Sequence, residues 1–91
     1  MDIKILGTGC AKCRKLYEET HRAVKLLGLN ATMTKVEKIE DIMAFKVLMT
    51  PALIIDGQVK AAGRIPTTAE LTNWLTTAAT GGDADKKIKL P

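Results

Sequence analysis

The fold of this chain is decided by the segment Thr50-Pro51-Ala52-Leu53-Ile54-Ile55-Asp56-Gly57, residues 50–57. A proline holds the residue before it in extended backbone and donates no ladder hydrogen bond, so any helix before Thr50 must already have ended. The aliphatic run 52–55 is separated by Asp56-Gly57 from a second short run at 58–62. Because Asp-Gly between two strand-like runs is the strongest short-range hairpin signal, this segment predicts two antiparallel strands.

The residues before this hairpin predict two strands and two helices. Residues 2–6 are mostly aliphatic and end at a Gly-Thr-Gly turn, as a strand does. Apolar positions then recur every three or four residues as far as Leu27, and Gly28 is a stop signal, so a long helix follows. Residues 30–36 alternate and contain threonine and valine, which predicts a second strand, and residues 39–44 form a short helix.

After the hairpin, Thr67-x-x-Glu70 has the form of a capping box and opens a last amphipathic helix that ends near Ala79. The composition then changes to glycine and charged residues. We therefore expect one folded domain over residues 1–79 and a flexible tail over residues 80–91. The order of elements is β-α-β-α-β-β-α, an α/β class, and the first β-α-β crossover places its two strands parallel.

Composition and charge exclude several classes of protein. The 91 residues are 46% hydrophobic, enough for one small core, and the net charge of +4 comes from 14 basic residues interleaved with 10 acidic ones. Only Tyr17, Phe45 and Trp74 are aromatic, too few for the stacking platforms of a single-strand nucleic-acid binder. The longest apolar stretch is about five residues, and the first residues lack the layout of a signal peptide. The sequence thus predicts a cytoplasmic monomer that binds neither nucleic acid nor membrane.

The only two cysteines, Cys10 and Cys13, lie where the Gly-Thr-Gly turn becomes the first turn of the long helix. The free amides and the dipole at a helix N-terminus favour negative charge, which lowers the pKa of a thiol placed there. Lys12, between the two cysteines, adds positive potential. Residues three apart in a helical turn also lie at a distance that a disulfide can span, so the pair can exchange between dithiol and disulfide.

Two other interpretations of the cysteine pair are consistent with its spacing. The thiols can be buried as small apolar groups without a chemical role. Alternatively, two thiolates can bind a soft, low-coordinate ion such as Cu(I), and heavy-metal-associated domains also place C-x-x-C after their first strand. A closed zinc site needs four ligands, and the single histidine, His21, lies eleven residues beyond Cys10, too far along the helix to join it.

The order of elements in the second half of the chain distinguishes these possibilities. A metal-transfer domain places its second helix between its third and fourth strands, whereas here a hairpin is followed by a terminal helix. Thr50-Pro51, hairpin and helix, together with the upstream C-x-x-C, resemble the thioredoxin superfamily, and within it the small thioredoxin-like or glutaredoxin-like redox proteins of prokaryotes. The resemblance covers residues 2–79 and implies a thioredoxin-like fold, a four-stranded mixed sheet with three helices, with a cis peptide bond before Pro51.

The resemblance also implies roles for single residues. Cys10 would be the exposed attacking thiol and Cys13 the shielded resolving thiol, while Thr50-Pro51 would dock the substrate backbone. The chain departs from the family where Ala11-Lys12 fills the motif and where Lys4 stands at the position of a buried acid. We therefore expect a thiol-disulfide oxidoreductase, without cofactor or metal, that exchanges protein disulfides and is recharged by an unidentified reductase. The alternative is a soft-metal binding or delivery module that uses the same two thiolates.

Overall fold

Within residues 1–80, the part of the chain that the computed structural model describes, seven elements follow the predicted order β-α-β-α-β-β-α. The strands form one sheet, so the predicted α/β fold with a four-stranded mixed sheet and three helices is confirmed. The last helix ends at the predicted Ala79, and the predicted tail lies, beyond Thr80, outside the described residues. In chain order the elements are β1 (Asp2–Leu6), α1 (Ala11–Leu27), β2 (Thr32–Val36), α2 (Ile39–Ala44), β3 (Ala52–Ile55), β4 (Gln58–Ala62) and α3 (Thr68–Ala79).

The sheet has the strand order β2-β1-β3-β4 and mixes parallel and antiparallel pairs. β1 runs parallel to β2 with Leu6 opposite Val36, and antiparallel to β3 with Leu6 opposite Ala52. The β3–β4 hairpin turns at Asp56 and Gly57, whose φ angles of 49° and 84° suit a tight hairpin turn. The carboxyl ends of β1 and β2 therefore meet the amino end of β3 at a single edge of the sheet.

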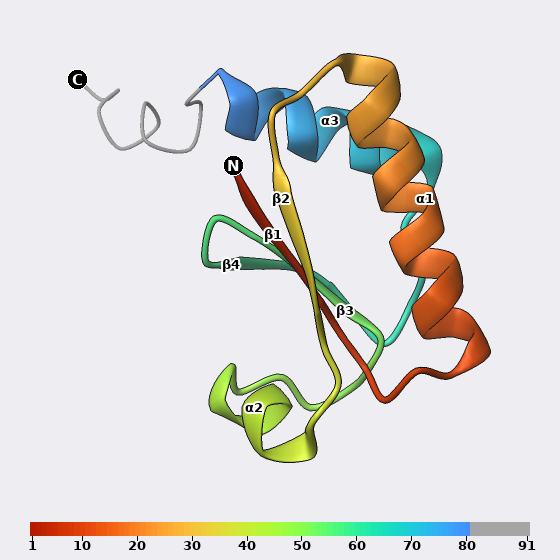
Figure 1. The fold of residues 1–91 in the computed structure, drawn as a ribbon, viewed down its shortest axis with the longest axis vertical. Coiled ribbons are helices and arrows are strands. Elements are labelled where there is room, and N and C mark those ends of the chain that lie inside the picture. The colour runs from red at the N-terminus through yellow and green to blue at the C-terminus, as the bar shows by residue number, and fades with distance from the viewer. Residues whose placement is uncertain (81–91) are drawn as a thin grey trace.

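The helices cover both faces of the sheet, with α1 and α3 side by side on one face and α2 on the other (Figure 1). Successive side chains of a strand point to opposite faces, so Ile3 and Ile5 of β1 pack under α1 and α3 while Leu6 packs toward Ile42 of α2. All four residues of the central strand β3 are buried, since both of its faces are covered. This packing holds the start of α1 against the sheet edge described above.

The ends of the two long helices are set by local chemistry. Gly28 ends α1 in the left-handed conformation, at φ 66°, and its amide donates to the Lys25 carbonyl over 3.1 Å. Thr67 and Glu70 form the predicted capping box at the start of α3, with the Glu70 amide donating to the Thr67 hydroxyl over 3.1 Å. None of the helices described within residues 1–80 is long and apolar enough to cross a membrane.

The core under α1 gives a first test of this packing. Leu16 is fully buried between α1 and the sheet, whereas Leu26 on the same helix is 78% exposed. Leu16→Ala should lower the free energy of unfolding by about 2–5 kcal/mol, because it removes apolar contacts and leaves a cavity. The matched control Leu26→Ala should change it by less than about 0.5 kcal/mol in the same urea titration. Equal losses in the two variants would contradict the placement of α1.

Candidate active site

The loop between β1 and α1 carries the chain from the sheet edge to the first cysteine. The Gly7 amide donates to the Val36 carbonyl over 2.9 Å, which extends the parallel pairing of β1 with β2 by one residue. Gly9 then takes a φ of 91°, a conformation that side chains other than glycine rarely adopt. This turn places Cys10 directly at the N-terminus of α1.

Cys10 is the N-cap residue of α1. Its backbone is extended, at φ −71° and ψ 172°, and its carbonyl accepts the first helical hydrogen bond, from the Arg14 amide over 3.0 Å. Its sulfur accepts a hydrogen bond from the Cys13 amide over 3.4 Å. The sulfur thus occupies the position of the hydroxyl oxygen in a serine or threonine cap. A sulfur that accepts hydrogen bonds in this way is favoured as a thiolate.

The two sulfurs lie 2.8 Å apart and both cysteines are free, so the site is in its dithiol state. Cys10 is exposed, whereas Cys13 is 6% exposed and faces the core. A disulfide needs sulfurs about 2.05 Å apart, so a shift of about 0.8 Å would bring the two into bonding distance. The pair lies at the start of the long helix with Cys10 exposed and Cys13 buried, as expected, and its catalytic role stays a prediction.

The pKa values of the two thiols move in opposite directions. Two hydrogen bonds lower the pKa of Cys10 below its usual value: the larger effect comes from the Cys13 thiol and the next from the Cys13 amide. Burial raises the pKa of Cys13, and the hydrogen bond to Cys10 raises it further. The Lys12 backbone amide adds to the lowering of the Cys10 pKa. The predicted effect of the Lys12 side-chain charge stays a prediction. The side chain of Lys12 is exposed, and water screens the charge of such a group.

Gly7 makes room for the buried sulfur. A methyl group built on Gly7 would overlap the Cys13 sulfur and would lie 3.9 Å from the Pro51 Cα. Gly7, directly after β1, therefore lies next to both the Cys13 sulfur and the backbone of Pro51. Gly7 carries no positive φ, so space and not backbone conformation excludes a side chain here. Sequence reasoning did not single out this close approach.

The Thr50–Pro51 peptide bond is cis, as the resemblance implied. Thr50 is exposed while Pro51 is buried, and the Pro51 carbonyl accepts from the Gly63 amide over 2.9 Å. Gly63 has a φ of 81°, and a methyl group built on it would lie 3.0 Å from the Met49 side chain. The loop before β3 is thus held closely by the end of β4. The substrate-docking role of Thr50 and Pro51 stays a prediction.

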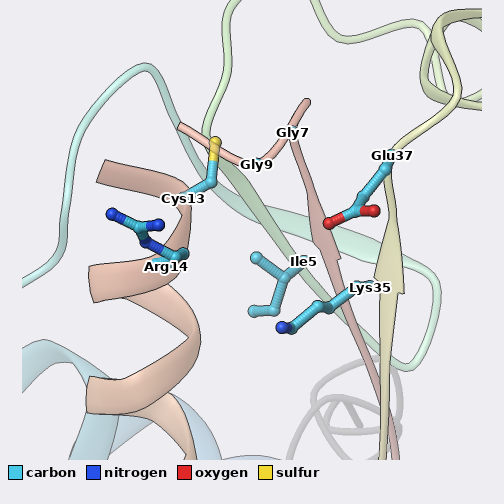
Figure 2. A pocket seen from close by; sticks show the side chains of 7 residues that line it. All are labelled: Ile5, Gly7, Gly9, Cys13, Arg14, Lys35 and Glu37. Carbon is cyan, nitrogen blue, oxygen red and sulfur yellow. The ribbon is translucent and has the colours of Figure 1, made fainter. Parts of the chain in front are cut away.

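A small cavity of about 20 Å³ lies beside Cys13, between the start of α1 and the edge strand β2. Figure 2 shows the Glu37 carboxylate turned from the end of β2 toward α1, and Arg14 on α1 itself. Lys35 also lines the cavity, and its ammonium lies 4.7 Å from the centre of the Tyr17 ring. Lys4 does not line this cavity. Its side chain is on the opposite face of β1 from that of Ile5, where it forms an ion pair with Asp2. The residues that line the cavity are Ile5, Gly7, Gly9, Cys13, Arg14, Lys35 and Glu37.

The opposite pKa shifts predict which thiol reacts first. Because its pKa is lowered, Cys10 carries more thiolate at neutral pH than an ordinary cysteine, and its alkylation rate should level off at a lower pH. Iodoacetamide treatment of the reduced protein, followed by peptide mass analysis, should find Cys10 modified well before Cys13. In Cys13→Ala the pH dependence for Cys10 should move upward, since the thiol that donates to it is gone. Preferential alkylation of Cys13 would contradict the assignment.

The contact between Gly7 and Cys13 predicts a destabilising substitution. Gly7→Ala should lower the free energy of unfolding of the reduced protein by about 1–3 kcal/mol, the usual cost of overpacking. In a Cys13→Ala background the same change should cost much less, because no sulfur stands where the new methyl group would be. A double-mutant cycle by urea unfolding measures this coupling. Additive losses would mean that the two residues do not contact each other.

Comparisons with known proteins agree with this geometry. Two proteins named thioredoxin are similar to the chain. One, from Methanothermobacter thermautotrophicus, is 36% identical over 75 residues, which span 82% of this chain and 97% of that protein. The other, from Methanocaldococcus jannaschii, is 37% identical over 73 residues, 80% of this chain and 84% of that protein. The family model described as "Thioredoxin domain" matches residues 1–76, nearly the whole described fold, and the chain therefore belongs to the thioredoxin family.

Proposed function

We propose that this protein is a thiol-disulfide oxidoreductase that exchanges protein disulfides through Cys10 and Cys13. One observation carries the proposal: two free sulfurs 2.8 Å apart at a helix N-terminus, one exposed and one buried. Membership of the thioredoxin family supports a redox function in general. The roles of the single residues are inferred from their exposure and their pKa shifts.

The reaction proceeds in two displacements. The Cys10 thiolate attacks one sulfur of the substrate disulfide, so that the substrate S–S bond breaks, one substrate thiolate leaves, and a mixed disulfide forms at Cys10. Cys13 then loses its proton and attacks the Cys10 sulfur, which forms the Cys10–Cys13 disulfide and releases the second substrate thiolate. Two electrons pass from the protein dithiol to the substrate, so the exchange itself requires no cofactor. A reductase returns the protein to the dithiol state.

The surface beside the cysteines fits a protein substrate. Leu48 is 98% exposed and Met49 is 61% exposed, and both lie in the loop that leads to Thr50-Pro51. Met43 at the end of α2 is exposed as well. Exposed apolar side chains of this kind are typical of protein contact surfaces. Extended substrate backbone would lie along Thr50-Pro51, beside Cys10, as the family resemblance implies. We place this exchange in the cytoplasm, where thiols are kept reduced.

Substitution of each cysteine tests the proposal. Cys10→Ser should abolish reduction of insulin disulfides, because the attacking thiolate is lost. Cys13→Ser should instead accumulate a covalent adduct with the substrate through Cys10, visible on a non-reducing gel and released by dithiothreitol. If Cys13→Ser turned over at the wild-type rate, or if the adduct formed at Cys13 in Cys10→Ser, the proposed roles would be wrong.

The soft-metal alternative makes a different prediction. Among residues 1–80, no group of three or more His, Cys, Asp or Glu side chains is arranged to hold a metal ion, so such an ion would have two thiolates as its ligands from this set. Under the proposed function, Cu(I) should be removed completely by a strong chelator such as bathocuproine disulfonate. A stoichiometric Cu(I) complex that survives this competition would favour metal delivery over disulfide exchange.

A further inference from the structure

The cavity beside Cys13 bears on a step that the two-displacement scheme leaves unassigned. Cys13 is buried, and burial favours its neutral thiol over the thiolate. Before it can displace the substrate, its proton must pass to an acceptor. Once Cys10 is bound in a mixed disulfide, its sulfur is no longer a thiolate that can take this proton. The protein groups that can serve as this acceptor are those that line the cavity beside Cys13.

Few groups near Cys13 can accept a proton. Gly7 has no side chain and meets the sulfur with backbone atoms, and Ile5 is apolar. Of the charged side chains that line the cavity, Arg14 from α1 and Lys35 from β2 are cations that only donate hydrogen bonds. The carboxylate of Glu37 is the one acidic group among the lining residues.

The position of Glu37 follows from the sheet. Its neighbour Val36 pairs with Leu6 and accepts from the Gly7 amide over 2.9 Å, so Glu37 comes directly after the last residue of β2, beside the loop that leads to Cys10. A methyl group built on Gly9 would lie 3.7 Å from Glu37 Oε2, which places the carboxylate against that loop. Figure 2 shows the side chain turned toward the cavity. The cavity volume of about 20 Å³ suffices for about one water molecule.

We propose that Glu37 accepts the proton of Cys13, through one water molecule in this cavity, when Cys13 displaces the substrate from Cys10. The proposal rests on the proposed disulfide exchange and adds a residue to it. It places the carboxylate at the end of β2, whereas the position of the family's buried acid in β1 is held by Lys4.

The step balances in atoms and electrons. The Cys13 thiol gives its proton to the water, and the water passes a proton to the Glu37 carboxylate. The Cys13 thiolate attacks the Cys10 sulfur, the new Cys10–Cys13 bond forms, and the bond between Cys10 and the substrate breaks. The substrate leaves as a thiolate with the electron pair of that bond. Glu37 then returns its proton to this thiolate or to bulk water, and no further oxidant or reductant is needed.

Reaction of the reduced protein with one equivalent of Ellman's reagent separates the two displacements. The first release of the coloured thiolate reports attack by Cys10, and the second reports displacement by Cys13. Glu37→Gln should slow the second phase by about tenfold, below the usual range of general-base catalysis because the carboxylate acts through water. The first phase should stay within about twofold of wild type. Glu40→Gln, which removes a carboxylate in α2 outside the cavity, is the matched control and should change neither phase.

If Glu37 acted only through its negative charge, Glu37→Gln would speed the second phase instead of slowing it. Removing a nearby negative charge favours both thiolates, so an electrostatic effect of Glu37→Gln would speed the reaction. Formate should restore the second phase of Glu37→Ala in proportion to its concentration, and chloride at equal ionic strength should not. A second phase in Glu37→Gln within threefold of the Glu40→Gln control, or a faster one, would overturn the role of Glu37. Release of only one equivalent by the wild-type protein would instead overturn the proposed disulfide exchange.

Discussion

The close contact between the Cys13 sulfur and the backbone of Gly7 is the constraint on which the rest of the site depends. It fixes how near the first turn of α1 lies to the end of β1, because nothing larger than hydrogen fits on Gly7. Pro51, directly before β3, borders the same space with its backbone. With Cys13 held there, the preceding turn of chain leaves Cys10 at the exposed helix end, 2.8 Å from its partner. One packing contact thus produces both the spacing and the difference in exposure.

The difference in exposure divides the chemistry between the two thiols. The exposed sulfur receives hydrogen bonds that lower the pKa of Cys10, and burial raises the pKa of Cys13. A neutral buried thiol does not compete for the incoming disulfide, but it must be deprotonated later. The parallel pairing of β1 and β2 brings the Glu37 carboxylate to the cavity beside Cys13, where we propose that it takes this proton. The site therefore draws on three strand ends and one helix, although only the helix end carries the cysteine motif.

Much of the fold could be predicted from the sequence because each element carries its own local signal. Three signals depend only on residues that are close in the sequence: the apolar spacing in α1, the Asp56-Gly57 turn, and the capping box of Thr67 and Glu70. All three features appear in the structure as predicted. The cysteine pair was predicted for the same reason. The predicted start of β2 at residue 30 was wrong, since the strand begins at Thr32 and Asn30 and Ala31 lie outside it.

The parts of the site that were not predicted depend on distances between elements. Residue 7 must be glycine because α1 lies so close to the end of β1. The spacing of apolar residues in the sequence does not reveal the distance between these two elements. Glu37 had a usable signal, since it follows a strand parallel to the one that carries the cysteines, and such strands end at the same sheet edge. Lys12 was expected to act through its charge; the structure adds a contribution of its backbone amide to the lowered Cys10 pKa, and the effect of the charge stays a prediction.

The central claim is that Cys10 and Cys13 form one reversible dithiol–disulfide couple. Equilibration of the protein in dithiothreitol buffers of defined potential, with acid quenching and mass analysis of trapped thiols, tests it most directly. The account predicts one two-electron transition with a slope near 30 mV per tenfold change in the ratio of oxidised to reduced protein, and an intramolecular Cys10–Cys13 disulfide as the oxidised product. Two independent one-thiol transitions, or oxidation only to mixed or intermolecular disulfides, would contradict it.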